Sequence, residues 1–405
     1  MQAGSGMNIG LAKPAFPCDT FRPMPARVLI VPDKFKGSLT ANEAASCIAR
    51  GWLKARPGDF LDLLPMSDGG EGFGGILGAL LGARTRKLAT LDAAHRPARA
   101  VWWWQAGNRT AVVESANVIG LAMLPPKQFH PFQLDTFGLG KVLAAAARAD
   151  ARECVVGIGG SATNDGGFGM ARALGWRFMD QAGVELAEWW RLAGLAGARA
   201  PARRLNLRVV AAVDVRNPLL GPDGCSAVFG PQKGLSPQDV AFAEKCLGRL
   251  ASVLAGQHGI NAAKIPGAGA AGGLGFGLMA FAGAKVESGF DLFARFAQLE
   301  KRIRAADIVL TGEGAIDEQT LMGKGVGQIA RSCARCGVPC VGLAGRVEPS
   351  LRRSGLFANL CALTERAAPQ RAQARAARLL EQLAAEAAVS WRPTSICQQP
   401  ISGVQ

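Results

Sequence analysis

The sequence is poor in histidine and in long apolar runs. Only 3 histidines occur among 405 residues, which argues against a Ser-His-Asp triad and against a histidine-containing zinc site. No apolar stretch reaches the roughly 18 residues that a transmembrane helix needs. The 10 cysteines show no framework spacing and no signal peptide precedes them, as is typical of free thiols in a cytoplasmic protein.

Two further kinds of motif are missing. The P-loop consensus G-x-x-x-x-G-K-[ST] does not occur, because Gly323-Lys324 is followed by Gly325. No zinc finger, homeodomain or RNP sequence accompanies the net charge of +15. Arginine is spread along the chain, which favours an enzyme that handles anionic substrates. We expect neither a nucleic-acid partner nor a membrane partner.

Glycine, in contrast, is abundant, with 52 residues that often follow apolar runs. The stretch 154–170 has the pattern of a buried strand, a glycine-rich turn and a helix. Such turns hold ligands in α/β proteins, because glycine permits close approach and helix amides attract anions. G-x-G-x-x-G motifs begin at Gly70 and Gly267, but about one match is expected by chance. A dinucleotide-dependent oxidoreductase is therefore the weaker alternative, with Asp180 a poor candidate for its ribose-binding acid.

Strands and helices alternate at both ends of the chain, with a mixed block between them. This order predicts an α/β fold, with a discontinuous Rossmann-like parallel-sheet domain of three α/β/α layers and an inserted second α/β domain containing a mixed sheet. We assign 26–92 and 285–390 to the first domain and 93–284 to the second. A disordered extension over 1–25 and a disordered tail over 391–405 complete the prediction.

Carboxylates and amides gather in the loops that follow the predicted strands, and Lys36, Lys233 and Lys324 add fixed cations. Glycine turns, carboxylates and lysines together suit a magnesium-bound nucleotide and a phosphoryl acceptor. The acidic and amide residues at these strand ends are Asp33, Asp68, Glu71, Glu114, Asn164, Asp165, Asp214, Asn217, Glu313, Asp317 and Glu318.

Two of these loops repeat one another. The segment S-D-G-G-E-G-F-G begins at Ser67, and N-D-G-G-F-G begins at Asn164. In the predicted topology one loop belongs to each domain, so we expect them to face a common cleft. We therefore expect Asn164 and Asp165, rather than the glycines, to carry the chemical role of the second loop.

Several long segments carry a more specific signal. They read P-D-K-F-K-G-S-L-T-A, P-M-S-D-G-G-E-G, G-G-S-A-T-N-D-G-G-F-G-M, D-V-R-N-P-L-L-G-P-D-G, F-G-P-Q-K-G, P-G-A-G-A-A-G-G-L-G and T-G-E-G-A-I-D-E-Q-T-L-M-G-K. From about Arg27 to the last predicted helix, the chain resembles the bacterial glycerate kinase family, type-1 group. It departs from that family in having Lys34 and Lys141 where serine and glutamate are usual, and in its N-terminal extension.

The resemblance implies ATP-dependent phosphorylation of D-glycerate with Mg²⁺, giving 2-phosphoglycerate and ADP in a cleft between the domains. Transfer to the 3-hydroxyl is the closest alternative. The oxidoreductase and a non-enzymatic small-molecule-binding protein are the more distant ones. A homodimer is compatible with the sequence, which leaves the oligomeric state open.

Phosphoryl transfer needs a base, a metal site and cations near the phosphates. We predict Asp165 or Asp214 as the base and Lys36 as a catalytic cation. The predicted metal ligands are Glu71, Glu313 and Asp317, although Glu71 could instead cap a helix and Asp317 close a turn. The predicted substrate-binding and nucleotide-binding residues are Asp33, Ser38, Ser67, Asp68, Gly69, Gly70, Ser161, Asn164, Asn217, Gly269, Gly312 and Lys324.

Overall fold

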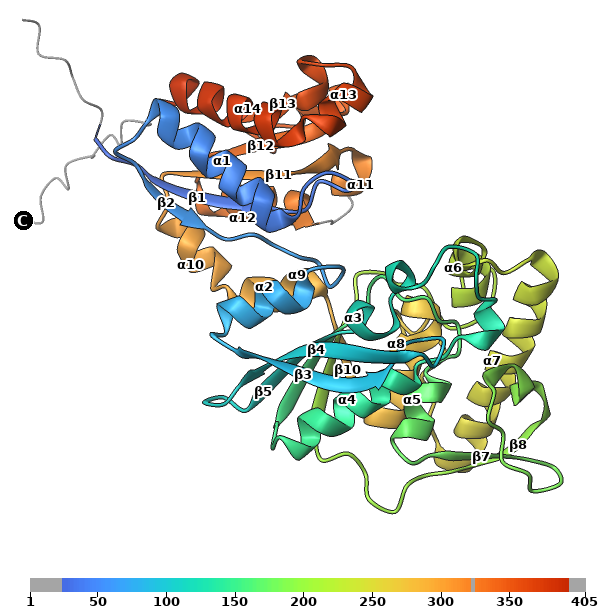
Figure 1. The fold of residues 1–405 in the computed structure, drawn as a ribbon. Helices are drawn as coiled ribbons and strands as arrows, with labels where there is room; N and C mark the ends of the chain where they lie inside the picture. The colour runs from blue at the N-terminus through green and yellow to red at the C-terminus, as the bar shows by residue number, and fades with distance from the viewer. Residues whose placement is uncertain (1–23, 322–324, 393–405) are drawn as a thin grey trace, which may run out of the picture.

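The structure is a computed structural model, and it describes residues 24–321 and 325–392 (Figure 1). Most of the predicted N-terminal extension and C-terminal tail lies outside these residues, as does the predicted binding residue Lys324. Among the described helices, none is both long enough and apolar enough to cross a membrane.

The first sheet has 5 parallel strands in the order β13-β12-β11-β1-β2. Its central strands are runs of apolar residues, because helices bury both faces. One face is covered by α1 (Ala41–Ala55) and α14 (Ala376–Ser390), and the other by α10 (Leu299–Arg304) and α12 (Gly325–Cys336). The strands are β1 (Arg27–Pro32), β2 (Phe60–Leu63), β11 (Ile308–Ile316), β12 (Cys340–Val347) and β13 (Asn359–Ala362).

The second sheet has 6 strands in the order β10-β9-β6-β5-β4-β3. It is mixed, because β3, β4 and β5 pair antiparallel while β5, β6, β9 and β10 pair parallel. The strands are β3 (Arg84–Leu91), β4 (Pro97–Gln105), β5 (Thr110–Glu114), β6 (Glu153–Gly157), β9 (Arg208–Ala212) and β10 (Lys285–Glu287).

The largest apolar core lies on one face of this second sheet. The helices around it are α3 (Ala116–Ile119), α4 (Phe137–Arg148), α5 (Phe168–Ala173), α6 (Cys225–Lys233), α7 (Pro237–His258) and α8 (Ala270–Ala282). The remaining short elements are β7 (Arg177–Asp180), β8 (Leu195–Arg199), α11 (Glu318–Leu321), α13 (Pro369–Ala374) and 3₁₀ turns at Leu121–Met123, Pro131–Gln133, Trp189–Gly194, Pro349–Arg353 and Leu363–Glu365.

Two helices, α2 (Phe73–Leu80) and α9 (Gly289–Phe296), lie at the junction of the two halves (Figure 1). Phe73 belongs to a cluster on the second sheet, whereas Phe293 belongs to the core beside the first sheet. The packing of α2 on β4 is close, since a Cβ on its Gly74 would lie 2.0 Å from the Trp103 ring. These helices therefore bury apolar side chains against both sheets.

The predicted α/β class with a parallel sheet and a second, mixed sheet is confirmed. The predicted domain limits, after residue 92 and before residue 285, need a correction. Both β3 and β10 hydrogen-bond within the second sheet, because β3 forms a hairpin with β4 and β10 extends the parallel ladder beside β9. We propose instead that the second domain begins just before β3 and ends just after β10.

The predicted disordered tail, 391–405, starts too early, because Trp391 still packs against α1. The Trp391 ring packs on Trp52 with centroids 6.0 Å apart, and the Arg56 guanidinium lies 4.9 Å from the same ring. Such aromatic and cation–π contacts stabilise the end of α14 against α1.

Candidate functional site

A cavity of about 400 Å³ opens at the carboxyl ends of β6 and β9. We call it the central cavity. Loops after β2, β6 and β9 contribute to it, together with the end of α6 and the start of α8. The carboxyl ends of parallel strands are where α/β proteins bind ligands. The lining consists of residues 68–70, 158–161, 212–215, 232–233 and 270–271, with Leu121 and Phe229.

The loops after β2 and β6 meet backbone to backbone in the wall of this cavity. The amide of Gly159 donates a hydrogen bond to the carbonyl of Gly69 over 3.2 Å. A Cβ on Gly159 would lie 2.7 Å from the Cα of Gly70, closer than any side chain tolerates. The glycines therefore serve the mutual approach of the two loops.

Asp214 extends from the end of β9 toward this wall. Its Oδ1 accepts a hydrogen bond of 3.0 Å from the amide of Gly289, the first residue of α9. Burial of the carboxyl group and the nearby charge of Asp68 raise the pKa of Asp214 to about 7. A carboxylate with a pKa near neutral suits a general base.

Lys233 lines the same cavity as the last residue of α6. It is only 9% exposed, and its Nζ donates a hydrogen bond of 2.6 Å to the carbonyl of Thr163. Burial lowers the pKa of the lysine to about 8. From the sequence we predicted Lys233, in the F-G-P-Q-K-G motif, as a fixed cation, but we did not include it among the site residues.

Ser161 and the start of α8 form the remaining polar wall. The Ser161 hydroxyl lies 3.0 Å from the Thr163 hydroxyl and 3.3 Å from the carbonyl of Ala271. Three consecutive residues here are left-handed, with φ of 55° at Ala271, 70° at Gly272 and 83° at Gly273. A left-handed alanine is unusual and costs conformational energy, a feature that often marks functional sites.

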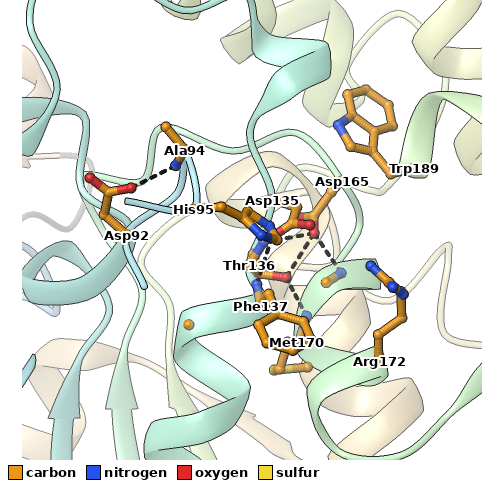
Figure 2. Close-up of polar contacts among 12 residues, drawn as sticks. Asp92, Ala94, His95, Asp135, Thr136, Phe137, Asp165, Met170, Arg172 and Trp189 are labelled. Atoms are coloured by element: carbon orange, nitrogen blue, oxygen red, sulfur yellow. Dashed lines mark hydrogen bonds and ion pairs between the residues drawn. The ribbon is translucent and has the colours of Figure 1, made fainter. Parts of the chain in front are cut away.

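Asp165 is placed differently from Asp214, and Figure 2 shows it among Asp135, Thr136 and Met170. It is fully buried and does not line the central cavity. Its Oδ2 accepts hydrogen bonds from Thr136 and Gly169, and its Oδ1 accepts one from Gly167. Burial and the neighbouring Asp135 raise its pKa to about 6. This geometry favours a structural role for Asp165 over its predicted role as base.

Asn164 is also fully buried, so the predicted emphasis on this residue is not supported by its position. Its Nδ2 donates to the Ser226 hydroxyl over 2.9 Å. The binding prediction for Asn217 has a similar difficulty, because its side chain donates to the carbonyl of Asp223 over 2.8 Å. Gly269 packs tightly, since a Cβ there would lie 2.1 Å from the carbonyl oxygen of Pro218.

A second group of predicted residues gathers after β1. Asp33, Lys36 and Ser38 line a cavity of about 390 Å³, and Lys36 and Ser38 also line a smaller one of about 220 Å³. We call these two cavities the β1 crevice. The smaller one includes Gly314 of β11, so it lies where the first sheet changes winding direction, between β1 and β11, which is a common ligand position. The larger one lies on the other side of β1, because its lining includes Met66, which follows β2. Gly312 belongs to β11, where a Cβ would lie 2.0 Å from the carbonyl oxygen of Leu343.

The loop 66–72 connects the two places. Met66, Glu71 and Gly72 line the β1 crevice, whereas the residues between them, 68–70, line the central cavity. Ser67 is buried inside this loop. The Nζ of Lys34 lies 3.5 Å from the position that a Cβ on Gly70 would take.

The predicted metal ligands do not form a single cluster. No group of three or more histidine, cysteine or acidic residues in the described chain could hold a metal ion by itself. Glu313 accepts a hydrogen bond from the Thr320 hydroxyl, and Asp317 pairs with Arg346 over 3.2 Å. Mg²⁺ in kinases needs only one or two carboxylates, because phosphate oxygens and waters complete its shell.

The pair Asp68 and Asp214 fits that requirement better. Both carboxylates belong to the central cavity, and the charge of Asp68 raises the pKa of Asp214. Neighbouring acids whose charges repel one another suit a divalent cation, and Asp68 is the one of the two that is not needed as the base. Asp68 was predicted for substrate binding rather than for the metal.

Comparisons with known proteins identify the family of this chain. A sequence model of the glycerate kinase family matches residues 28–392. This chain belongs to the glycerate kinase family. Glycerate kinase from Bacillus subtilis is 37% identical over 326 residues, which cover 80% of this chain and 85% of the relative. Glycerate 2-kinase from Escherichia coli is 35% identical over 329 residues, covering 79% and 85%.

A solved structure shares the fold as well. The crystal structure of a protein assigned as glycerate kinase 2 from Salmonella typhimurium LT2 is 31% identical, with a TM-score of 0.77. The match covers 90% of this chain and 97% of that one. The predicted family resemblance and kinase class are therefore confirmed.

Proposed function

We propose that the chain is an ATP-dependent kinase that phosphorylates D-glycerate at its 2-hydroxyl, with Mg²⁺, in the central cavity. The observation that carries this proposal is the convergence of Asp68, Asp214 and Lys233 from three separate elements on one cavity. The E. coli relative's name, glycerate 2-kinase, supports transfer to the 2-hydroxyl. ATP, Mg²⁺ and D-glycerate are the proposed ligands.

Asp214 is the proposed base of this reaction. It takes the proton of the acceptor hydroxyl, whose oxygen then bonds to the γ-phosphorus of ATP. The bond from that phosphorus to the bridging oxygen breaks, and ADP leaves with the electron pair. A pKa of about 7 supports this role, because a base is most effective when its pKa is near the working pH.

The β1 crevice is the proposed nucleotide site. The position of its smaller cavity at the switch point of the parallel sheet supports this assignment, and Lys36 lines both of its cavities. Lys34, beside Gly70, is then a second cation between nucleotide and acceptor. Asp68 is the proposed holder of Mg²⁺, which when bound neutralises charge on the phosphates.

The test is an assay with D-glycerate, ATP and Mg²⁺, read by ADP release and by ³¹P NMR of the product. A 2-phosphate couples to one neighbouring proton and gives a doublet, whereas a 3-phosphate couples to two and gives a triplet. No ADP release from the folded protein contradicts the kinase proposal. A triplet contradicts the 2-hydroxyl assignment and leaves the kinase standing.

We propose a cytoplasmic location on the basis of the cysteines. The 8 described cysteines are all free thiols, which is usual in a reducing compartment. Light scattering of the purified protein tests whether it forms the homodimer with which the sequence is compatible.

A further inference from the structure

Lys233 is a buried cation that forms no ion pair with any carboxylate in the described part of the chain. Its Nζ has one hydrogen-bond acceptor in the described chain, the carbonyl of Thr163 at 2.6 Å. An ammonium group carries three donors, so two of them face other surroundings. With only 9% of the residue exposed, bulk water does little to satisfy them.

The fold holds this charge in place. α6 ends at Lys233, and Gly234 follows with a φ of 106°, a left-handed conformation that stops the helix. Taking an unpaired charge out of water is strongly unfavourable. A buried lysine at the wall of a cavity is best explained by an anion that binds there and accepts hydrogen bonds from its remaining N–H groups.

The charges around Lys233 limit which anion fits. Asp165 is a buried acid whose charge raises the pKa of Lys233, whereas burial keeps the Cys225 thiol on the same helix as Lys233 neutral. Asp68 and Asp214 line the same cavity. A monoanion balances the single charge of Lys233, whereas a phosphate dianion would add a second negative charge near these acids.

We propose that Lys233 binds the carboxylate of the acceptor, so that the central cavity selects 2-hydroxy acids over neutral polyols. This inference rests on the proposed function. The two unused N–H groups of the ammonium donate to the carboxylate oxygens. The 2-hydroxyl, on the adjacent carbon, is then available to Asp214 in the same cavity. Lys233 thereby decides substrate class, while Asp214 carries the proton.

The test measures binding by calorimetry, with and without a non-hydrolysable ATP analogue. The ligands are D-glycerate and its uncharged amide, and the proteins are the wild type and Lys233→Met. Loss of one partner of a buried charge pair weakens binding on the order of 100-fold. We expect this loss for D-glycerate and less than about 3-fold for the amide. Lys87→Met, on the exposed edge strand β3, is the matched control and keeps wild-type affinity for D-glycerate.

Three outcomes overturn the inference. The first is wild-type affinity for D-glycerate in Lys233→Met. The second is a rise in KM for ATP in Lys233→Met with KM for D-glycerate unchanged, which would show that Lys233 binds a phosphate of ATP instead. The third is a wild-type protein that binds D-glycerate under neither condition. If D-glycerate binds through Lys233 but no ADP is released, the kinase proposal fails and the carboxylate site stands.

A measurement on the wild type covers the case in which Lys233→Met does not fold. Near pH 8.5 a lysine with a pKa of about 8 is largely neutral, so binding of a carboxylate draws a proton onto it. We expect net proton uptake, seen as a binding enthalpy that depends on the ionisation enthalpy of the buffer. Uptake of the same size when the uncharged amide binds would overturn the inference.

Discussion

Two loops with the same D-G-G core do different work in this molecule. In the loop after β6, Asp165 stands two residues before Gly167, the residue that precedes α5. In the loop after β2, Asp68 stands four residues before Gly72, the residue that precedes α2. Both glycines are left-handed, with φ of 79° and 87°.

The helix start needs a buried acceptor in both loops, and the spacing decides which residue supplies it. Asp165 is near enough to accept hydrogen bonds from the amides of Gly167 and Gly169. Asp68 is too far from α2, and Glu114 at the end of β5 accepts from the amides of Gly72 and Gly74 instead. The loop after β2 has two more residues between its aspartate and the helix, so Asp68 remains at the cavity. The shorter spacing in the loop after β6 buries Asp165 at the start of α5.

The sharpest test of this contrast is Asp68→Asn. A carboxylate that helps to hold Mg²⁺ or to organise charge at the reacting centre is worth 10²–10³ in rate, so we expect kcat to fall about 1,000-fold. The free energy of unfolding should change by less than about 0.5 kcal/mol. Steady-state kinetics and urea denaturation measure the two effects. Asp62→Asn, an exposed acid paired with Arg302, is the control with unchanged kcat.

Asp165→Asn should show the opposite pattern. The amide keeps one acceptor oxygen and points donors at amide N–H groups, so at least one helix start loses its partner. We expect the free energy of unfolding to fall by about 3 kcal/mol, with kcat of the folded enzyme within about 3-fold of wild type. A stable but inactive variant would return Asp165 to the role of base.

The pH dependence of stability separates the two aspartates further. Burial raises the pKa of Asp165 from 3.8 to about 6 in the folded protein. The folded state therefore holds this proton more tightly, and its contribution to stability is greatest below pH 4 and is lost as pH rises through 6. We expect a loss of about 1 kcal/mol between pH 5 and pH 7 from this group. The slope should persist in Asp68→Asn and disappear in Asp165→Asn.

The smallest expected effect belongs to Glu114→Gln. Burial already raises the pKa of Glu114, so a neutral replacement loses less there than at an ionised cap. We expect a fall in unfolding free energy of under about 1 kcal/mol. KM for D-glycerate should rise a few-fold, because residues 68–70 of this loop line the central cavity. An unchanged KM would show that the hydrogen bonds of Glu114 at the start of α2 do not affect binding in the central cavity.

The sequence identified both loops but placed the aspartates of both in the active site. The partner that frees Asp68 comes from β5, more than 40 positions along the chain, and no local pattern reports it. Strand β3 (Arg84–Leu91) lies inside the segment 26–92 that we assigned to the first domain, and only its pairing with β4 places it in the second sheet.

Lys233 illustrates the same limit in the site. Its motif was recognised, yet the burial that distinguishes it from other lysines arises where α6 packs beside Thr163, a residue 70 positions away. In contrast, the glycines at Gly69 and Gly159 were predictable as loop residues, because close backbone approach is one of the few needs that glycine alone meets.

The two junction helices have a mechanical consequence. The starts of α2 and α9 are tied to the second sheet, through Glu114 and Asp214 respectively. Their contacts with the first sheet are apolar side chains, such as Ile76 and Phe290, which have no directional bonds. If the two halves rotated about a hinge, these apolar side chains would slide over the first sheet without breaking a directional bond. Residues 68–70 and Asp214, which line the central cavity, would then move together with the second sheet.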